Sequence, residues 1–199
     1  TQKYMLNNGY NAGKFSSYLS INHDRTDGHR LNSAFHITNG FLKLGYRFNE
    51  HFNLTGDLSL AKYKNQNPGK VDKPILDNIM HILRGTTSAA LENHFDRTSG
   101  ALRVFFNWGH HKINDGYSEG STPRGYLFFS NDHNAGLQLY QSFRLLPGNN
   151  LTAGIDYKNW GGHAWNDSIN GRQAEIVNES VHEVAGYVVM QQELFEKLS

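Results

Sequence analysis

Short and long polar interruptions alternate strictly along this chain of 199 residues. The short ones fall at residues 9–13, 49–51, 96–99 and 146–150, and the long ones at residues 25–32, 65–85, 112–123 and 161–176. If the segments between them are strands, every short turn lies at one end and every long loop at the other. This asymmetry is typical of an up-and-down antiparallel meander in a membrane barrel, and a soluble β-sandwich has no reason to produce it.

Period-two alternation identifies the strands, because successive side chains of a strand point to opposite faces. Around residues 49–51, Lys43 and Asp57 alternate with an apolar set: Leu42, Leu44, Tyr46, Phe48, Phe52, Leu54, Leu58 and Leu60. Similar hairpins surround residues 96–99 and 146–150. Together with strands at both ends of the chain, the pattern predicts nine strands, and a helical turn is possible only within residues 75–83.

The two predicted faces differ in charge. Leu44, Leu58, Val104, Leu139 and Ile155 belong to a face that carries no Lys, Arg, Asp or Glu along its central runs, and the opposite face carries charges of both signs, including Asp57, Arg103 and Asp156. A charged side chain that faces lipid at the bilayer midplane costs about 2–4 kcal/mol. The pattern therefore predicts one face toward lipid and the other toward a wet lumen.

Aromatic residues lie near both ends of the predicted strands, as they do in strands that cross a membrane. Tyr46, Phe48, Phe52, Phe95 and Phe143 lie beside the short turns, and Trp108 and Trp160 lie at the far ends of their strands. Rings at both ends of an apolar band form interfacial girdles. The predicted fold class is all-β: an antiparallel up-and-down meander of about nine strands, part of a larger transmembrane β-barrel.

Composition agrees with this prediction and excludes other classes. Mean hydropathy is −0.61, and no stretch approaches the roughly 18 apolar residues that a membrane helix requires. A barrel strand needs only alternate apolar residues. The net charge of +1 argues against a nucleic-acid partner, and the absence of cysteine excludes disulfides and thiolate metal sites.

The odd number of strands has a consequence for the domain. With short turns on the periplasmic side, the first strand begins outside and the last ends inside, near residues 195–199. Single-chain bacterial barrels have an even number of strands with both ends inside. We therefore expect residues 1–199 to be a partial outer-membrane barrel domain, with further strands elsewhere in a parent protein.

Several segments, taken together in chain order, resemble a known family. They are TQKY at residues 1–4, INHDRTDGHR at 21–30, LKLGYR at 42–47, NLTGDLSL at 53–60 and VAGYV at 184–188. These segments resemble the barrel of TonB-dependent outer-membrane receptors, particularly those of Bacteroidetes. The resemblance implies a barrel of about twenty-two strands around an N-terminal plug domain that this chain lacks.

The resemblance also implies a function and partners. Such receptors sit in the lipid of the bacterial outer membrane and import a scarce nutrient such as a ferric siderophore, haem or cobalamin. The expected partners are outer-membrane lipid, the plug domain of the same parent chain, the TonB complex through that parent, and the small-molecule nutrient. A resident cofactor is not implied.

Candidate ligand contacts come from the long interruptions and from His110 and His111 directly before one of them, since loops are free to encode specificity. The candidates are His81, His110, His111, Tyr117, His163 and Trp165. Adjacent strand residues point to opposite faces, so His110 and His111 cannot share one metal ion, and no metal site is predicted. The carboxylates expected in the lumen lie on different strands, and we expect no enzymatic activity. Alternative functions are a passive or structural outer-membrane barrel, such as a porin or adhesin, and a soluble β-sandwich binding module.

Overall fold

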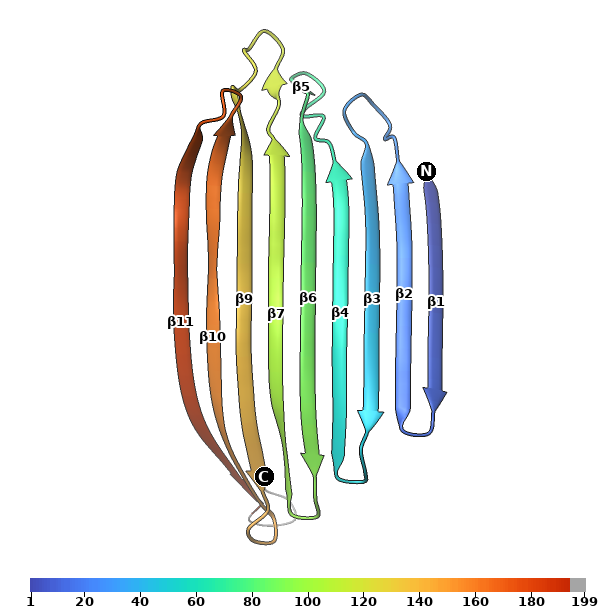
Figure 1. Ribbon diagram of the computed structural model, residues 1–199, viewed down its shortest axis with the longest axis vertical. Coiled ribbons are helices and arrows are strands. Elements are labelled where there is room, and N and C mark those ends of the chain that lie inside the picture. The colour runs from blue at the N-terminus through green and yellow to red at the C-terminus, as the bar shows by residue number, and fades with distance from the viewer. Residues whose placement is uncertain (194–199) are drawn as a thin grey trace.

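The computed structural model describes residues 1–193 and arranges them as one antiparallel meander (Figure 1). The sheet contains nine strands: β1 (Gln2–Ala12), β2 (Phe15–Thr26), β3 (Phe35–Arg47), β4 (Phe52–Asn65), β6 (Ile79–His94), β7 (Thr98–Asn114), β9 (Tyr126–Phe143), β10 (Asn149–Ser168) and β11 (Gln173–Gln192). Two short strands, β5 (Ile75–Leu76) and β8 (Tyr117–Ser118), pair with each other outside this sheet. The predicted all-β class and the antiparallel meander of nine strands are confirmed.

Each strand of the sheet pairs with its sequence neighbours, and the connections differ between the two ends (Figure 1). Residues 13–14, 48–51, 95–97 and 144–148 make the short turns, as predicted. At the other end, residues 27–34, 66–78 and 115–125 form long loops. The part of the chain that the structure describes contains no helix that is long and apolar enough to span a membrane. The predicted end of the last strand near residues 195–199 lies outside the described residues.

Two sequence-based expectations at the loop end are wrong. Residues 161–176 are not a long loop, because β10 and β11 continue through them and only residues 169–172 connect the two strands. Residues 75–83 contain no helical turn, because β5 and the first residues of β6 occupy them. In residues 161–176, cross-strand pairing overrides a local composition rich in polar residues and glycine. In residues 75–83, the isoleucines favour strands, and both parts of the segment pair with neighbouring strands.

The pairing register assigns every side chain to one of two faces. We call a set of residues paired across the strands a row. Leu44, Val104 and Leu137 belong to rows of one face, which we call the apolar face, together with Leu58, Leu139 and Ile155. Asp57, Arg103 and Asp156 lie on the other, the polar face. The predicted separation of the two sets is confirmed.

The sheet has almost no interior of its own. Among the described residues, the buried hydrophobic side chains are Ala101 and Ala164 alone, whereas Leu139 is 48% exposed and Ile155 is 55% exposed. In a β-sandwich, these leucine and isoleucine side chains would interdigitate with a second sheet. The absence of a second layer over the described residues argues against the sandwich alternative.

Two polar residues on the apolar face, Asn93 and Gln141, are satisfied by each other. The Asn93 Nδ2 donates to Gln141 Oε1 at 3.0 Å, and the Gln141 Nε2 donates to Asn93 Oδ1 at 3.0 Å. Gly100 separates them in the same row, and a Cβ there would collide with the Gln141 amide. We call Asn93 and Gln141 the amide pair. Their mutual hydrogen bonds remove the penalty of leaving amides without partners in an apolar setting.

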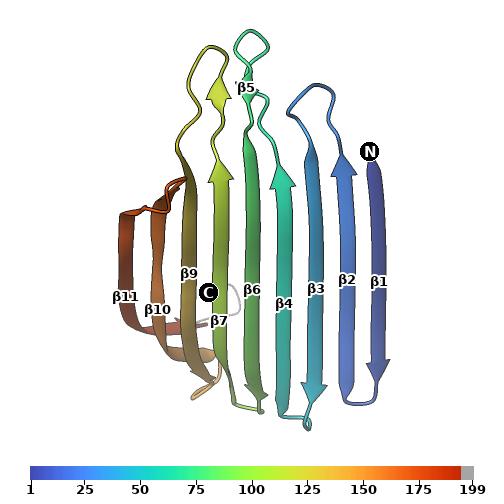
Figure 2. The ribbon, with the colours of Figure 1, turned by 45° about the horizontal axis from the view of Figure 1, so that its top comes forward.

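Aromatic side chains cover glycines on both faces. On the apolar face, Trp108 lies over Gly85, where a Cβ would meet the indole, and stacks on Phe106 with ring centroids 5.4 Å apart. On the polar face, Tyr187 covers Gly154 in the same way. Such cross-strand coverage compensates for the missing glycine side chain. The sheet as a whole is curved, and β9, β10 and β11 bend away from the plane of the earlier strands (Figure 2).

Candidate functional site

Three long loops at one end of the sheet are tied into one assembly, which we call the loop platform (residues 27–34, 66–78 and 115–125). The first two loops are joined because the Arg30 guanidinium donates to the Gly69 carbonyl and Asn32 Nδ2 donates to the Ile75 carbonyl at 3.1 Å. The second and third are joined by the pairing of β5 with β8, in which Leu76 faces Tyr117. Loops linked in this way present one shared surface rather than three independent tips.

Asn78 anchors the platform to the top of the sheet. It is 5% exposed, accepts a hydrogen bond from the Asn67 amide at 2.9 Å and donates to the Asn114 carbonyl at 3.0 Å. Asn67 begins the second loop, and Asn114 ends β7. A single buried amide side chain therefore holds the roots of two loops together, and no local sequence pattern distinguishes it from the other asparagines.

Tyr117 is the one predicted candidate that lies within the loop platform. It is half-buried in β8 and paired with Leu76. Around it, Gly116 adopts a positive φ of 70°, and a Cβ at this position would collide with the Leu76 carbonyl. Glycine is required where the backbone makes so close an approach. The tips of the platform stay open, with Leu31 and Val71 each 89% exposed.

Below the platform, the polar face carries a charged cluster that includes the predicted candidate His111. The Arg84 Nη1 donates to Asp132 Oδ2 at 2.8 Å and lies 3.5 Å from His111 Nε2. His111 Nδ1 lies 2.9 Å from the Ser130 hydroxyl. Gly109 separates Arg84 from Asp132, and a Cβ there would meet both side chains. The cluster offers an exposed cation, an anion and an imidazole to whatever occupies this side of the sheet.

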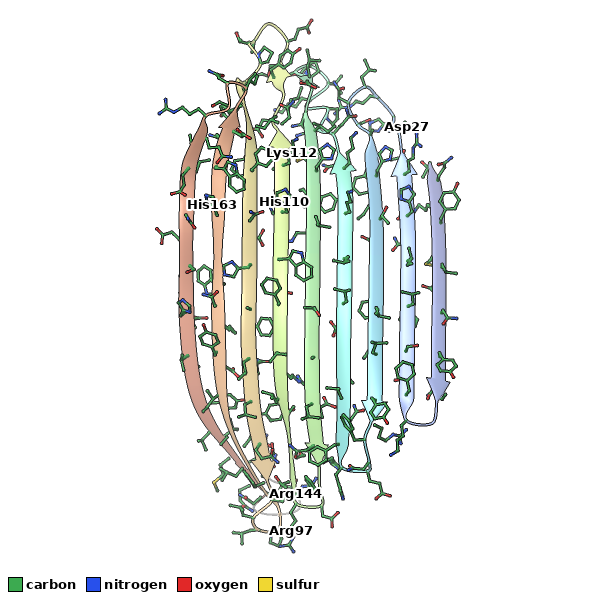
Figure 3. All side chains as sticks on the ribbon, viewed as in Figure 1. Asp27, Arg97, His110, Lys112, Arg144 and His163 are labelled. Atoms are coloured by element: carbon green, nitrogen blue, oxygen red, sulfur yellow. The ribbon has the colours of Figure 1, made fainter. Side chains whose placement is uncertain are left out.

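His110, His163 and Trp165 all lie on the apolar face and on strands rather than loops, and His110 and His163 occupy one row two strands apart (Figure 3). His163 stacks on Trp165 with centroids 4.6 Å apart, and Trp165 stacks on Phe129 at 5.5 Å. His110 lies 6.5 Å from the same Phe129 ring. The expectation that His163 and Trp165 lie in a loop is wrong, because β10 extends to Ser168. The sequence analysis did not identify Phe129, because only the pairing of the strands places its ring beside Trp165 and His110.

His81 also lies on a strand of the apolar face, between Lys64 and Lys112 in one row. It therefore shares a face with His110 and His163 and is separated from His111. The structure thus divides the six candidates into three groups, one on each face and one in the platform. Among residues 1–193, no three His, Cys, Asp or Glu side chains are close enough to hold a metal ion.

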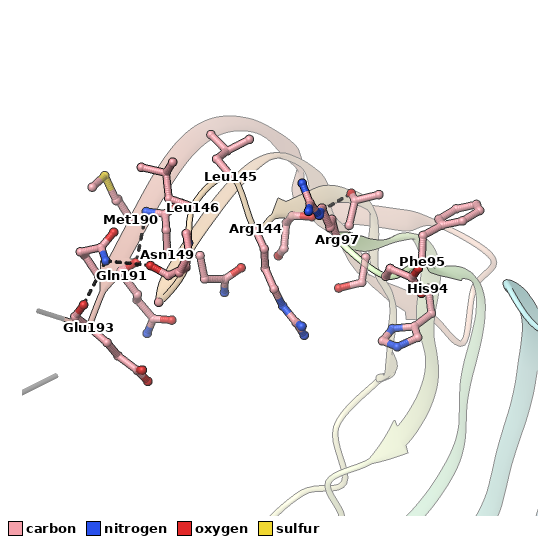
Figure 4. Close-up of a pocket in the computed structure, with 18 residues that line it drawn as sticks. His94, Phe95, Arg97, Arg144, Leu145, Leu146, Asn149, Met190, Gln191 and Glu193 are labelled. Atoms are coloured by element: carbon pink, nitrogen blue, oxygen red, sulfur yellow. Dashed lines mark hydrogen bonds between the residues drawn. The ribbon is translucent and has the colours of Figure 1, made fainter. Parts of the chain in front are cut away.

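A separate cavity of about 1140 Å³ lies at the opposite end, among the short turns (Figure 4). Its lining includes Phe95, Arg97, Arg144, Leu146 and Met190. Arg97 and Arg144 belong to adjacent turns, which are joined by the Arg144 amide donating to the Arg97 carbonyl at 2.8 Å. None of the six predicted candidates lines this cavity. It lies where the sheet curves at its short-turn end.

Comparisons with known proteins give structural likeness only. No family model and no curated protein matches this chain. Among solved structures, the ferric yersiniabactin uptake receptor FyuA from Yersinia pestis is similar, with a TM-score of 0.48 and 9% identity over 98% of this chain and 42% of that one. The ferric citrate transporter FecA in its unliganded form is similar, with a TM-score of 0.41 and 13% identity over 98% of this chain and 40% of that one. The chain therefore spans less than half the length of either protein.

Proposed function

We propose that this chain forms part of the wall of an outer-membrane β-barrel in a TonB-dependent receptor that imports a scarce nutrient. One observation carries the membrane assignment. On the apolar face, the rows from Phe52 to Trp108 contain no Lys, Arg, Asp or Glu. Over the same span, the polar face carries charges of both signs: Lys43, Arg47, Asp57, Glu92, Arg103, Asp156, Lys158 and Glu183.

The physical reason is the difference in solvent on the two sides. Lipid can solvate no charge, whereas a water-filled lumen solvates both signs, so a barrel wall separates its residues in this way. A free-standing sheet in water would gain nothing from one wholly uncharged face. Its exposed apolar side chains, such as Ile155 and Leu139, would instead form a large patch prone to association.

The edges of the sheet support a larger barrel. In the described sheet, β1 and β11 each have one strand neighbour and do not pair with each other. Open edges cannot persist in the hydrocarbon region, because their backbone amides and carbonyls would lack partners. Further strands of a parent protein, with a plug domain inside the barrel, would supply the missing partners in this proposal.

Within the proposal, the loop platform contacts the nutrient. Loops at one end of a barrel line its external mouth, and interlocked loops hold a binding surface with less loss of conformational entropy than free loops. The same linkage favours a receptor over a passive porin or adhesin, because a channel gains nothing from joining its loops through paired strands. Tyr117 is the candidate best placed for this role, and ferric siderophore, haem and cobalamin are the proposed ligand classes.

Two measurements on the intact parent protein test the proposal. Heat-modifiable migration and protease protection in outer-membrane vesicles report whether the barrel inserts. Replacement of residues 66–78, or separately of residues 115–125, by a Gly/Ser linker is expected to abolish nutrient uptake while leaving insertion intact. Replacement of the short connection at residues 169–172 is the control. Insertion with unchanged uptake in both loop variants would move ligand recognition to the plug or to other strands.

A further inference from the structure

The strongest unassigned feature is a group of three lysines and one histidine on the apolar face, next to its uncharged rows at the loop end. Lys64, His81 and Lys112 occupy one row on neighbouring strands. Lys62 lies in the next row on the same face toward the short turns, between Thr38 and Leu83. We call these four residues the basic rim. All four side chains are exposed. The row below Lys62 belongs to Leu60, Gly85 and Trp108, which close the uncharged band.

The basic rim brings like charges together without a counter-charge. Lys64 and Lys112 lie two strands apart in one row, Lys62 lies one row away on the strand of Lys64, and like charges this close repel each other. In the two rows of the rim, from β2 to β9, the apolar face carries no Asp or Glu. Among the described residues, no ion pair involves Lys62, Lys64 or Lys112. An external anion would therefore stabilise this surface.

The distance of the basic rim from Trp108 indicates which kind of anion can reach it. Same-face residues are spaced about 7 Å along a strand, so the lysines lie roughly one and two spacings above Trp108. This places them beside the headgroups when the tryptophan is at the interface, and the flexible lysine stems can extend further outward. Lys112 also lies 5.6 Å from the Phe129 ring, within the aromatic cluster of His163 and Trp165. Mixed cationic and aromatic surfaces of this kind suit amphipathic headgroups.

We propose that the basic rim binds the phosphate groups of anionic lipids in the outer leaflet of the membrane. The inference rests on the proposed barrel, because only a lipid-facing orientation brings the rim to headgroups. The rim lies at the loop end of the sheet, which is the external end of the proposed barrel, so its position agrees with contact with the outer leaflet (Figure 3). At the short-turn end, the cations Arg97 and Arg144 lie in turns rather than on a row of the apolar face.

The test uses the complete parent protein in nanodiscs made of equal parts phosphatidylcholine and phosphatidic acid. Native mass spectrometry measures how many phosphatidic acid molecules the released protein retains relative to phosphatidylcholine. The rim variant is Lys62→Gln, Lys64→Gln and Lys112→Gln together. The matched control is Lys3→Gln, Lys43→Gln and Lys158→Gln, which removes three lysines from the polar face.

The unaltered protein is expected to prefer phosphatidic acid. Each basic residue near an anionic surface strengthens attachment about fivefold, so the rim variant should lose on the order of a hundredfold of that preference in low salt. The control should keep it. Equal retention by the rim variant and the unaltered protein would overturn the inference, and so would displacement of the lipid by inorganic phosphate. Failure of all three proteins to enter the bilayer would instead reject the barrel itself.

Discussion

The two faces of this sheet share one backbone and differ in almost everything else. Between the rows of Phe52 and Trp108, the apolar face has no formal charge, and the two amides of the amide pair hydrogen-bond to each other. The polar face over the same span carries an ion pair that is open to solvent, Arg103 with Glu92 at 3.5 Å. The difference shows that solvent on each side, rather than strand propensity, selected the side chains.

The largest expected effect comes from placing a charge on the wrong face. Thr87 and Thr86 are neighbours on β6 and point to the apolar and polar faces respectively. We predict that Thr87→Arg destabilises the barrel in a bilayer by about 2–4 kcal/mol, whereas Thr86→Arg changes its stability little. Chemical unfolding of the parent protein in vesicles measures both.

A third variant separates the charge from a lost hydrogen bond. The Thr87 hydroxyl donates to the Asp57 carbonyl at 2.9 Å, and Thr87→Val removes this bond without adding a charge. We expect the valine variant to be much closer to the unaltered protein than the arginine variant. Similar losses for Thr86→Arg and Thr87→Arg would show that neither face lies against lipid.

The next effect concerns the loop platform, which depends on long-range contacts rather than on a face. Asn78→Ala leaves the Asn67 amide and the Asn114 carbonyl without their partner, at a cost of about 1–3 kcal/mol. We predict faster amide hydrogen exchange across residues 66–78 and 115–125, with unchanged exchange in the strands. Asn8→Ala, on an exposed strand position, is the control, and exchange that rises throughout the sheet would contradict a local role for Asn78.

The amide pair offers a sharper test of the apolar face. A double-mutant cycle with Asn93→Ala and Gln141→Ala is expected to give a coupling free energy of about 1–2 kcal/mol, since hydrogen bonds in an apolar setting have this magnitude. Gly100→Ala should cost more than the loss of the pair, because the added methyl collides with the Gln141 amide and also with the Tyr140 backbone carbonyl. A coupling near zero would mean that water reaches the pair, and that the apolar face is wet at this row.

Sequence patterns predicted the strands and most of the faces, because both depend on local rules. Trp160 is an exception, since it was expected in an interfacial girdle of the apolar band and lies on the polar face. Alternation between Leu58 and Asp57, or between Val104 and Arg103, is visible along the chain and needs no knowledge of partners. Short turns such as residues 48–51 fix which strands pair. These local signals were sufficient for the nine-stranded meander and for the separation of its two sets of side chains.

The loop end was harder to predict, because its structure depends on partners distant in sequence. Gly161 and Asn166 suggest a loop, yet they pair with His133 and Phe128 as part of β10. Asn78 acquires its role only when β4, β6 and β7 bring Asn67 and Asn114 to it. Likewise, the histidine candidates were chosen by composition, and only the register shows which face each one occupies.

The smallest expected effect lies on the polar face, and it completes the contrast with the apolar one. Arg84 and Asp132 form an ion pair of 2.8 Å, with side chains 44% and 38% exposed. Because water and salt screen exposed pairs, a double-mutant cycle with Arg84→Gln and Asp132→Asn should give only about 0.2–1 kcal/mol, falling further as salt is added. Denaturation of the parent protein in vesicles at low and high salt measures it. A coupling as large as that of the amide pair, and insensitive to salt, would mean that this side of the sheet is packed against a dry partner rather than an aqueous lumen.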